Sequence, residues 1–415
     1  MHGDSFIPAA GWALPFAGLL LAIAILPLAA PHFWDSNLRK LMVAGALALP
    51  VLALYAQARP EALVHAASDY VSFIILLGGL FVISGGILLE GDLQATTRTN
   101  ALLLGTGALC ASFVGTTGAS MLLIRPLLQT NRERKRVVHT VVFFIFLVSN
   151  IGGCLTPLGD PPLFLGYLAG VPFTWTLRLL PEWLLTVALV LAVYVVWDRR
   201  ERRRETLADL KRDFYEVRPL RIAGKDNLVL LLGVLAAVAL LQAPWRELVI
   251  VGLAALSYFR TDRELHAANR FTFQPILEVA ALFAGIFVTM LPALDLLRAR
   301  GAELGVREPW QFFWASGMLS SFLDNAPTYL TFLALAKGLG LPPEVAGVPH
   351  EILRAISLGS VFMGANSYIG NGPNFMVRAI AEERGVKMPS FGGYMLYSGA
   401  VLLPIFFVVT LVFFR

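Results

Sequence analysis

Residues 149–162 read SNIGGCLTPLGDPP and stand in the middle of an apolar run that extends from 137 to 170. Three glycines and three prolines in this short segment lower the helix propensity and remove backbone N–H donors. Irregular backbone at membrane depth persists only where protein or water satisfies its polar groups. The segment therefore predicts a broken helix over 137–170, made of two half-helices and an unwound joint.

The chain around this segment has the composition of an integral membrane protein. It has 415 residues, of which 57% are hydrophobic and 15% charged, and a mean hydropathy of +0.69. A helix needs roughly 20 mostly apolar residues to cross a membrane. The runs of this kind predict about ten transmembrane helices, at 12–30, 41–56, 70–89, 137–170, 177–197, 228–241, 248–259, 276–294, 352–380 and 394–414.

Two further apolar stretches, 101–128 and 310–336, are interrupted near their middles by small and polar residues. The first reads VGTTG at 114–118, and the second reads LDNAP at 323–327. We interpret both stretches as re-entrant helical hairpins. The predicted fold class is therefore all-α, with about ten transmembrane helices and two hairpins.

The second half of the chain repeats the first. Residues 112–117 correspond to 321–326 at an offset of 209, and residues 153–162 correspond to 364–373 at an offset of 211. Each half holds five spans and one hairpin, and an odd number of spans turns the second half upside down. We expect two inverted repeats, 1–197 and 228–415, joined by a cytoplasmic linker at 198–227, with a second broken helix at 352–380.

The orientation follows from the basic loops. The densest groups of Lys and Arg lie at 132–136 and 199–225, and such loops are typically cytoplasmic. Counting spans outward from them places both termini outside. The net charge of +5 comes from these loops, so it indicates topology rather than nucleic-acid binding. No Lys or Arg precedes the first apolar run, so we expect the first helix to be retained rather than cleaved.

The predicted joints and hairpin tips carry oxygen-rich side chains, which suit a hard cation such as Na⁺. We expect Asp160, Asp324, Asn150 and Asn366 to be the Na⁺ ligands. The full set of candidate ion- or substrate-binding residues is Asp160, Asp324, Asn150, Thr156, Thr116, Thr117, Asn325, Thr328, Asn366, Ser367 and Asn371.

The two carboxylates allow a second interpretation. Asp160 precedes Pro161, and Asp324 stands three residues before Pro327, so each could serve only as a helix N-cap. An intramembrane carboxylate is costly, however, and a cap does not require the charge. The neutral Asn371 matches Asp160 in the repeat. Burial disfavours the ionised form of a carboxylic acid, so such a group could exchange a proton for Na⁺.

Other charged residues have simpler interpretations. Asp69 and Glu278 are expected to be first-turn acids that oppose a helix dipole. Arg125 and Arg378 either snorkel to the cytoplasmic surface or pair with a carboxylate or a bound anion. The chain contains no P-loop, nucleophilic triad or metal-ligand spacing, so we expect neither an enzyme nor a resident cofactor.

The segments SNIGG at 149–153 and GDPP at 159–162, together with LDNAPT at 323–328, resemble the signature regions of the ion transporter superfamily. That superfamily includes NhaD-type sodium/proton antiporters, arsenite permease-like proteins and citrate and dicarboxylate transporters. The chain looks most similar to a sodium/proton antiporter branch labelled citrate-transporter-like. The tip of the first predicted hairpin, 115–118, reads Gly-Thr-Thr-Gly, whereas a Ser-Asn-Thr tip is expected in a dicarboxylate carrier. The resemblance implies an elevator-type homodimer in a bacterial-type inner membrane.

The favoured function is Na⁺/H⁺ antiport by alternating access, with sodium ions, protons and the lipid bilayer as partners. A sodium- or proton-coupled carrier of citrate or another organic anion is the main alternative. An anion or metalloid permease and a membrane-embedded enzyme are further alternatives. Two acids near the site favour a cation, whereas an anion carrier more naturally uses neutral side chains and half-helix N-termini.

The orientation can be tested by cysteine labelling of intact cells. A membrane-impermeant reagent applied from outside should miss single cysteines placed within 198–225 and should label a cysteine at Arg415. Labelling of the 198–225 linker from outside would reverse the assigned orientation.

Overall fold

The computed structural model describes residues 6–206 and 217–415, so part of the predicted linker, 207–216, lies outside the described residues. The first half contains α1 (Leu14–Ala29), α2 (Pro31–Trp34), α3 (Asn37–Ala58), α4 (Pro60–Gly85), β1 (Leu88–Asp92), α5 (Thr97–Val114), α6 (Thr116–Thr130), α7 (Val138–Leu147), α8 (Pro161–Leu168) and α9 (Leu180–Arg202). The second contains β2 (Arg218–Ala223), α11 (Asp226–Leu240), α12 (Trp245–Arg260), α13 (Arg263–Ala268), α14 (Gln274–Arg300), α15 (Pro309–Ser320), α16 (Asn325–Lys337), α17 (His350–Met363), α18 (Gly372–Glu383) and α19 (Phe391–Phe413). Short 3-10 helices lie at Ala10–Ala13, Ile151–Cys154, Phe173–Leu179, Gly301–Leu304 and Gly364–Asn366.

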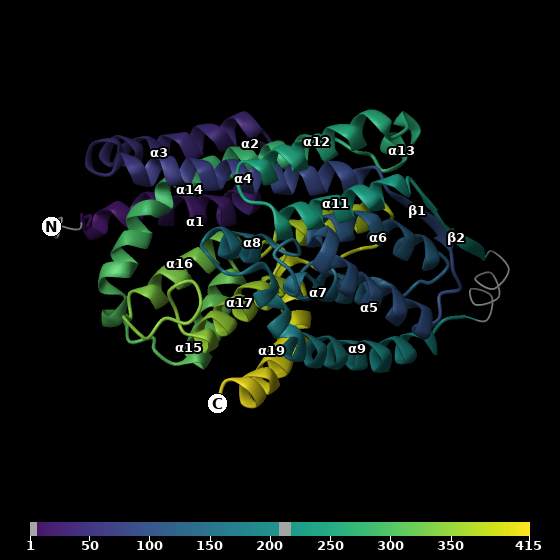
Figure 1. Cartoon of the computed structure of the whole chain (residues 1–415). Coiled ribbons are helices and arrows are strands. Elements are labelled where there is room, and N and C mark those ends of the chain that lie inside the picture. Colours follow the sequence, from purple (N-terminus) through teal and green to yellow (C-terminus); the bar gives the residue numbers. More distant parts are fainter. Residues whose placement is uncertain (1–5, 207–216) are drawn as a thin grey trace.

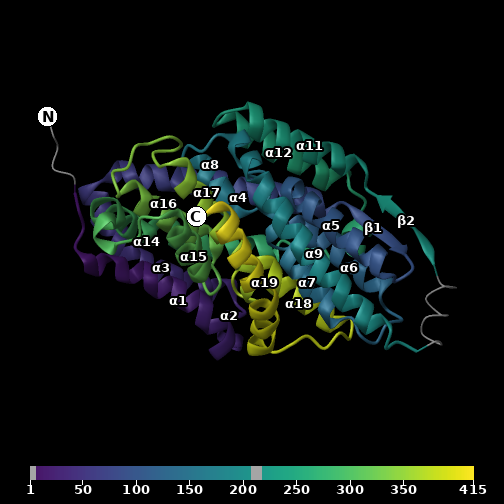
Figure 2. The ribbon, with the colours of Figure 1, turned by 90° about the horizontal axis from the view of Figure 1, so that it is seen from below.

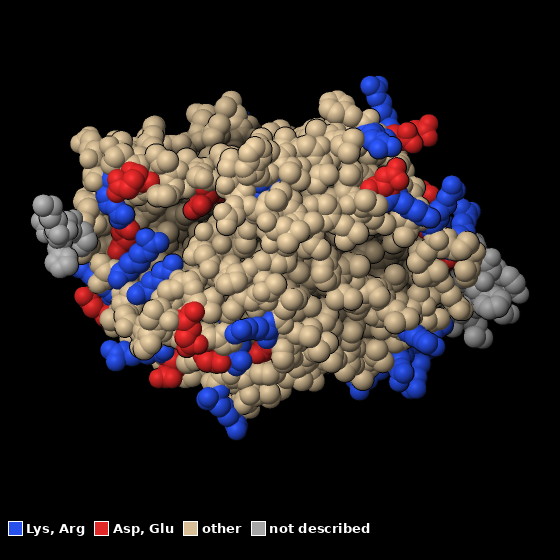
Figure 3. Space-filling view, viewed as in Figure 1, with Lys and Arg blue, Asp and Glu red and all other residues tan. Residues whose placement is uncertain are grey.

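The predicted all-α membrane fold is confirmed. Within the described residues, six helices are long and apolar enough to cross a membrane, namely Ala10–Pro27, Asn37–Ala58, Pro60–Gly85, Phe173–Arg202, Gln274–Leu304 and Phe391–Phe413. The long helices run side by side along one direction (Figure 1). Charged side chains gather toward the two ends of this direction and leave the middle of the visible face nearly bare (Figure 3). This is the charge distribution expected of a chain that crosses a bilayer.

The interior holds two hydrophobic cores. One is built from α5–α9 and α15–α19. The other is built mainly from α1, α3, α4, α11, α12 and α14. Only α8 and α16, among the described helices of the first group, contribute buried residues to both cores. Figure 1 shows α3, α4 and α12 of the second group along one side of the broken helices. Figure 2, the view from below, shows α19 of the first group in front.

Both predicted hairpins are pairs of helices. α5 and α6 meet at Gly115, whose φ of 83° is readily adopted only by glycine. α15 and α16 are separated by residues 321–324. Both predicted broken helices are interrupted by 3-10 turns, between α7 and α8 and between α17 and α18.

Two sequence-based expectations are wrong in detail. Asp69 lies well inside α4 rather than in its first turn, because Pro60 starts this helix directly after α3 and its first turns are more polar than the predicted span. Glu278 is the fifth residue of α14, after its first turn, and its carboxylate lies 2.6 Å from the Lys40 ammonium of α3. β2, which lies within the predicted linker, also pairs with β1 in an antiparallel two-stranded sheet that hydropathy did not predict.

Each unwound joint contains a very close approach of backbone to backbone at an equivalent glycine. A Cβ on Gly159 would collide with the carbonyl oxygen of Gly153, and a Cβ on Gly370 would stand 2.5 Å from the carbonyl oxygen of Gly364. Only glycine fits such contacts, so the joints require it for space rather than for a positive φ.

Gly159→Ala should therefore destabilise the protein by at least about 2 kcal/mol, because the crowding atom is backbone and cannot rotate away. The measurement is the thermal unfolding midpoint in detergent. Gly399→Ala is the matched control, since a Cβ there meets nothing within 4 Å and Ala has the higher helix propensity. Equal midpoints for Gly159→Ala and the wild type would contradict the close approach.

Candidate functional site

The two unwound joints have the same local structure. α8 begins at Pro161 after Asp160, and α18 begins at Gly372 after Asn371. The backbone angles at the two preceding residues agree, with φ/ψ of −145°/142° at Asp160 and −154°/142° at Asn371. An extended residue directly before the helix is the usual N-cap geometry.

The hairpins satisfy the joints through equivalent hydrogen bonds. The Thr156 hydroxyl donates to the carbonyl oxygen of Ser112, and the Ser367 hydroxyl donates to the carbonyl oxygen of Ser321. In each joint the backbone N–H two residues further on donates to the same hydroxyl, at 3.1 and 3.2 Å. The hydroxyls of Ser112 and Ser321 in turn donate to carbonyls at the start of each joint. Hairpin and joint therefore form one hydrogen-bonded unit in each half.

The two units meet at Asp160. Its Oδ1 accepts hydrogen bonds from Thr116 Oγ1 at 2.8 Å and from Asn371 Nδ2 at 3.0 Å, and its Oδ2 accepts one from Asn325 Nδ2. Thr116 and Asn325 open the second arms of the two hairpins and are equivalent at the offset of 209. The Asp160 carboxylate is 1% exposed. It is thus a buried group held by three neutral side chains from three other elements.

Asp160 does not act as a side-chain cap, although its backbone holds the N-cap position. Its carboxylate makes no hydrogen bond to the first turn of α8. Asp324 behaves differently, because its Oδ1 accepts a hydrogen bond from the Ala326 backbone N–H at 3.0 Å and caps α16. The two carboxylates interact electrostatically, but no hydrogen bond joins them in the described structure.

Three amide oxygens near the joints lack hydrogen-bond partners among the described residues. They are the buried Oδ1 atoms of Asn150, Asn325 and Asn366. The orientation of each amide is set by its nitrogen, since Asn150 Nδ2 donates to Asn374 at 2.7 Å and Asn366 Nδ2 donates to Ser321 at 2.9 Å. Buried carbonyl oxygens without donors are the ligand type that a hard cation requires.

The remaining candidates serve other contacts. The hydroxyls of Thr156 and Ser367 hold the joints, and the Thr328 hydroxyl donates to the carbonyl oxygen of Asp324 at 2.9 Å. Thr117 lines a cavity of about 70 Å³ between the first hairpin tip and helices α4 and α14. The predicted set therefore divides into a cluster around Asp160, amide oxygens of Asn150, Asn325 and Asn366 that lack partners among the described residues, and hydroxyls that support the backbone.

Asn374 is the main site residue that the sequence did not predict. It is the third residue of α18, directly after Gly372 and Pro373. Its Nδ2 donates to the carbonyl oxygens of Gly364 and Ser367 at 2.8 and 2.9 Å, and its Oδ1 accepts from Asn150. Asn374 thus links the joint of one half to the joint of the other. Its place directly after the Gly372-Pro373 break, three residues from Asn371, could have indicated it.

The comparisons with known proteins agree with a membrane carrier. A family model described as "putative citrate transport" matches residues 7–414. The chain is also similar to the P protein of Mus musculus, with 29% identity over 117 residues, and to the P protein of Sus scrofa, with 31% identity over 72 residues. These matches cover 25% and 17% of this chain and only 14% and 8% of the two relatives.

Replacing Asn374 by Ala should lower the stability by about 2–4 kcal/mol, because two buried carbonyl oxygens lose this donor and one of the two Asn150 amide hydrogen bonds is lost. The thermal unfolding midpoint in detergent measures this loss. Phe375→Ala provides a neighbouring control, since its ring is 46% exposed. An Asn374→Ala midpoint no lower than that of the control would show that the link between the joints adds little.

Proposed function

The chain belongs to this citrate-transport family, and from that premise we propose that it is a cation-coupled secondary transporter that exchanges Na⁺ for H⁺. The family, the matched range and the helical fold support a multi-pass membrane transporter rather than an enzyme. The exchange of Na⁺ for H⁺ is our assignment from the geometry of the site.

The observation that carries the proposal is the environment of Asp160. Of the residues that the structure describes, no Lys, Arg or His forms an ion pair with this buried carboxylate. A buried charge without a counter-ion is unfavourable, so the group needs either a proton or a cation. The Asn325 amide, which contacts this carboxylate, has a buried oxygen without a donor that can add a ligand for a cation. The same group can therefore bind the two ions alternately.

Alternating access requires the site to move relative to a fixed part. We propose that the core of α5–α9 and α15–α19 is the transport domain and that α1, α3, α4, α11, α12 and α14 form the scaffold. The equivalent hydrogen bonds of the two joints support the assignment of two inverted repeats. A homodimer joined through the scaffold, in a bacterial-type inner membrane, is part of the same proposal.

A second candidate function rests on the family description, which names citrate. In a cation-coupled citrate carrier, Asp160 would still bind the coupling ion. The substrate would then occupy the small cavity at the first hairpin tip, beside Thr116 and Thr117. This cavity is small in the described conformation, and its polar lining is neutral.

Asp160→Asn should abolish Na⁺-driven proton movement, because it removes the charge that the two ions share while keeping the size of the side chain. The measurement is dye-reported internal pH in proteoliposomes after a Na⁺ pulse. We expect the flux to fall at least about 100-fold, since an intramembrane carboxylate is the coupling group.

Asp324→Asn is the matched control, because Asn is an equally good N-cap and keeps the contact with Ala326. We expect this variant to retain Na⁺-driven proton movement with an apparent Na⁺ affinity weakened about threefold to tenfold, as a nearby negative charge is lost. Normal proton movement by Asp160→Asn would refute the assignment. Na⁺-driven citrate uptake by the wild type, without proton export, would select the citrate carrier instead.

Competition between the two ions predicts the pH dependence. A proton on Asp160 excludes Na⁺, so the apparent Na⁺ affinity should rise with pH by at most about tenfold per unit and then level off. Initial proton flux against Na⁺ concentration at several pH values measures this affinity. An Na⁺ affinity that does not change with pH would exclude a shared site.

A further inference from the structure

A cavity of about 490 Å³ opens at the end of the molecule that carries the β1–β2 sheet, away from the Asp160 site. Its walls come from both proposed domains. The sheet follows α4 of the scaffold, whereas Arg125 stands on α6, the second arm of the first hairpin, and Arg384 directly follows α18. The basic loops predict that this end is cytoplasmic.

The lining of this cavity has an excess of positive charge. It includes four arginines, Arg125, Arg218, Arg221 and Arg384. None of the four forms an ion pair with another described residue. Two acids also line the cavity, but Asp92 already accepts a hydrogen bond from Gln129 and lies 3.4 Å from Arg132. Glu90 alone cannot neutralise four guanidinium groups.

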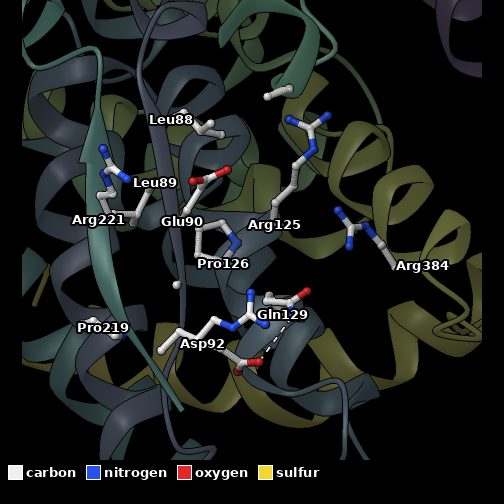
Figure 4. A pocket seen from close by; sticks show the side chains of 13 residues that line it. Leu88, Leu89, Glu90, Asp92, Arg125, Pro126, Gln129, Pro219, Arg221 and Arg384 are labelled. Carbon is white, nitrogen blue, oxygen red and sulfur yellow. Dashed lines mark hydrogen bonds between the residues drawn. The ribbon is translucent and has the colours of Figure 1, made fainter. Parts of the chain in front are cut away.

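Arg125 is the group that most needs a ligand. Its Nη1 atom is buried and has no hydrogen-bond partner among the described residues. The positive charge of Arg384 acts on it in addition. Figure 4 shows the side chains of Arg125 and Arg384 reaching the same space from different elements. A buried charged donor without an acceptor is unfavourable, so an anion that accepts a hydrogen bond from Arg125 would be stabilised there.

The chemistry of the lining indicates which anion. A guanidinium group presents several donors in a plane and binds phosphate oxygens in a bidentate manner. The strand β2 places Arg218 and Arg221 on the cavity, while its Leu220 and Ile222 are 41% and 40% exposed. A strand with arginines on one side and exposed aliphatic side chains on the other suits the depth of lipid headgroups.

We propose that this cavity is a phosphate-binding site centred on Arg125, for the phosphate of an anionic lipid headgroup or of a soluble phosphate. The bound phosphate accepts hydrogen bonds from Arg125 and Arg384 on one side and from the arginines of β2 on the other. It therefore joins the hairpin arm and α18 to the sheet, across the boundary between the proposed domains. The site is independent of Asp160, so it does not depend on the identity of the transported ion.

The test uses the full-length protein, purified and lipid-depleted in a neutral detergent. The thermal unfolding midpoint is followed while inorganic phosphate, citrate, dihexanoyl-phosphatidylglycerol or dihexanoyl-phosphatidylcholine is added at constant ionic strength. A saturable rise with phosphatidylglycerol alone assigns the site to lipid, and a rise with inorganic phosphate as well assigns it to phosphate from either source. No saturable rise with either overturns the proposal, as does a larger rise with citrate than with phosphate.

The variants locate the effect. Arg125→Gln and, separately, the exposed Arg384→Gln should weaken the apparent affinity at least about tenfold, because each removes charge-assisted hydrogen bonds. Arg263→Gln is the matched control, since it removes one positive charge from α13 at the same end of the molecule without lining the cavity. An equal loss of apparent affinity in Arg263→Gln, Arg125→Gln and Arg384→Gln would mean that the anion is attracted by net charge alone. That result would also overturn the proposed binding site.

Discussion

A helix that stops inside a membrane leaves backbone N–H and C=O groups that neither lipid nor bulk water can satisfy. The rest of this structure depends on how that requirement is met. In each half, a hydroxyl of the joint donates a hydrogen bond to the backbone of a serine in the hairpin. The Thr156 hydroxyl donates to the carbonyl oxygen of Ser112, and the Ser367 hydroxyl donates to the carbonyl oxygen of Ser321. The hairpins are therefore structural partners of the broken helices, and each joint is rigid enough to hold a side chain in place.

The two joints have the same backbone conformation before the second half-helix, but the residue at that position is charged in one joint and neutral in the other. Asp160 and Asn371 have almost the same φ and ψ, and their side chains contact each other at 3.0 Å. If capping alone determined the residue, Asn would serve at both positions. The carboxylate appears in only one of them and is turned away from its own helix toward the partner joint. This asymmetry within an otherwise equivalent pair is the strongest physical reason to assign a function to Asp160.

The sequence predicted the elements that follow from local chemistry. Glycine and proline marked both joints, and apolar runs located the helices, since these signals act within a few residues. The sequence could not predict which side chains would meet, because Asp160 and Asn325 are 165 residues apart and are brought together only by the packing of the two halves. It also missed the β1–β2 sheet, because the alternation of Arg and aliphatic residues in β2 is too short to stand out in a basic linker. Asp69 was misplaced because α4 continues beyond its apolar part.

The helices that carry the site also explain how it could change its exposure. α8 and α16 begin next to Asp160 and Asp324, and these two helices belong to both hydrophobic cores. The contacts that they make with the second core are mostly apolar, apart from the hydrogen bond that the Tyr167 hydroxyl of α8 donates to the Val238 carbonyl oxygen of α11 at 3.0 Å. Apolar contacts are not directional. A sliding movement can exchange one set of such contacts for another at little cost, whereas the hydrogen-bonded joints must move as a unit because each buried donor would otherwise lose its partner. The division between directional bonds around Asp160 and non-directional packing around α8 and α16 therefore favours movement between the two cores over deformation of the site itself.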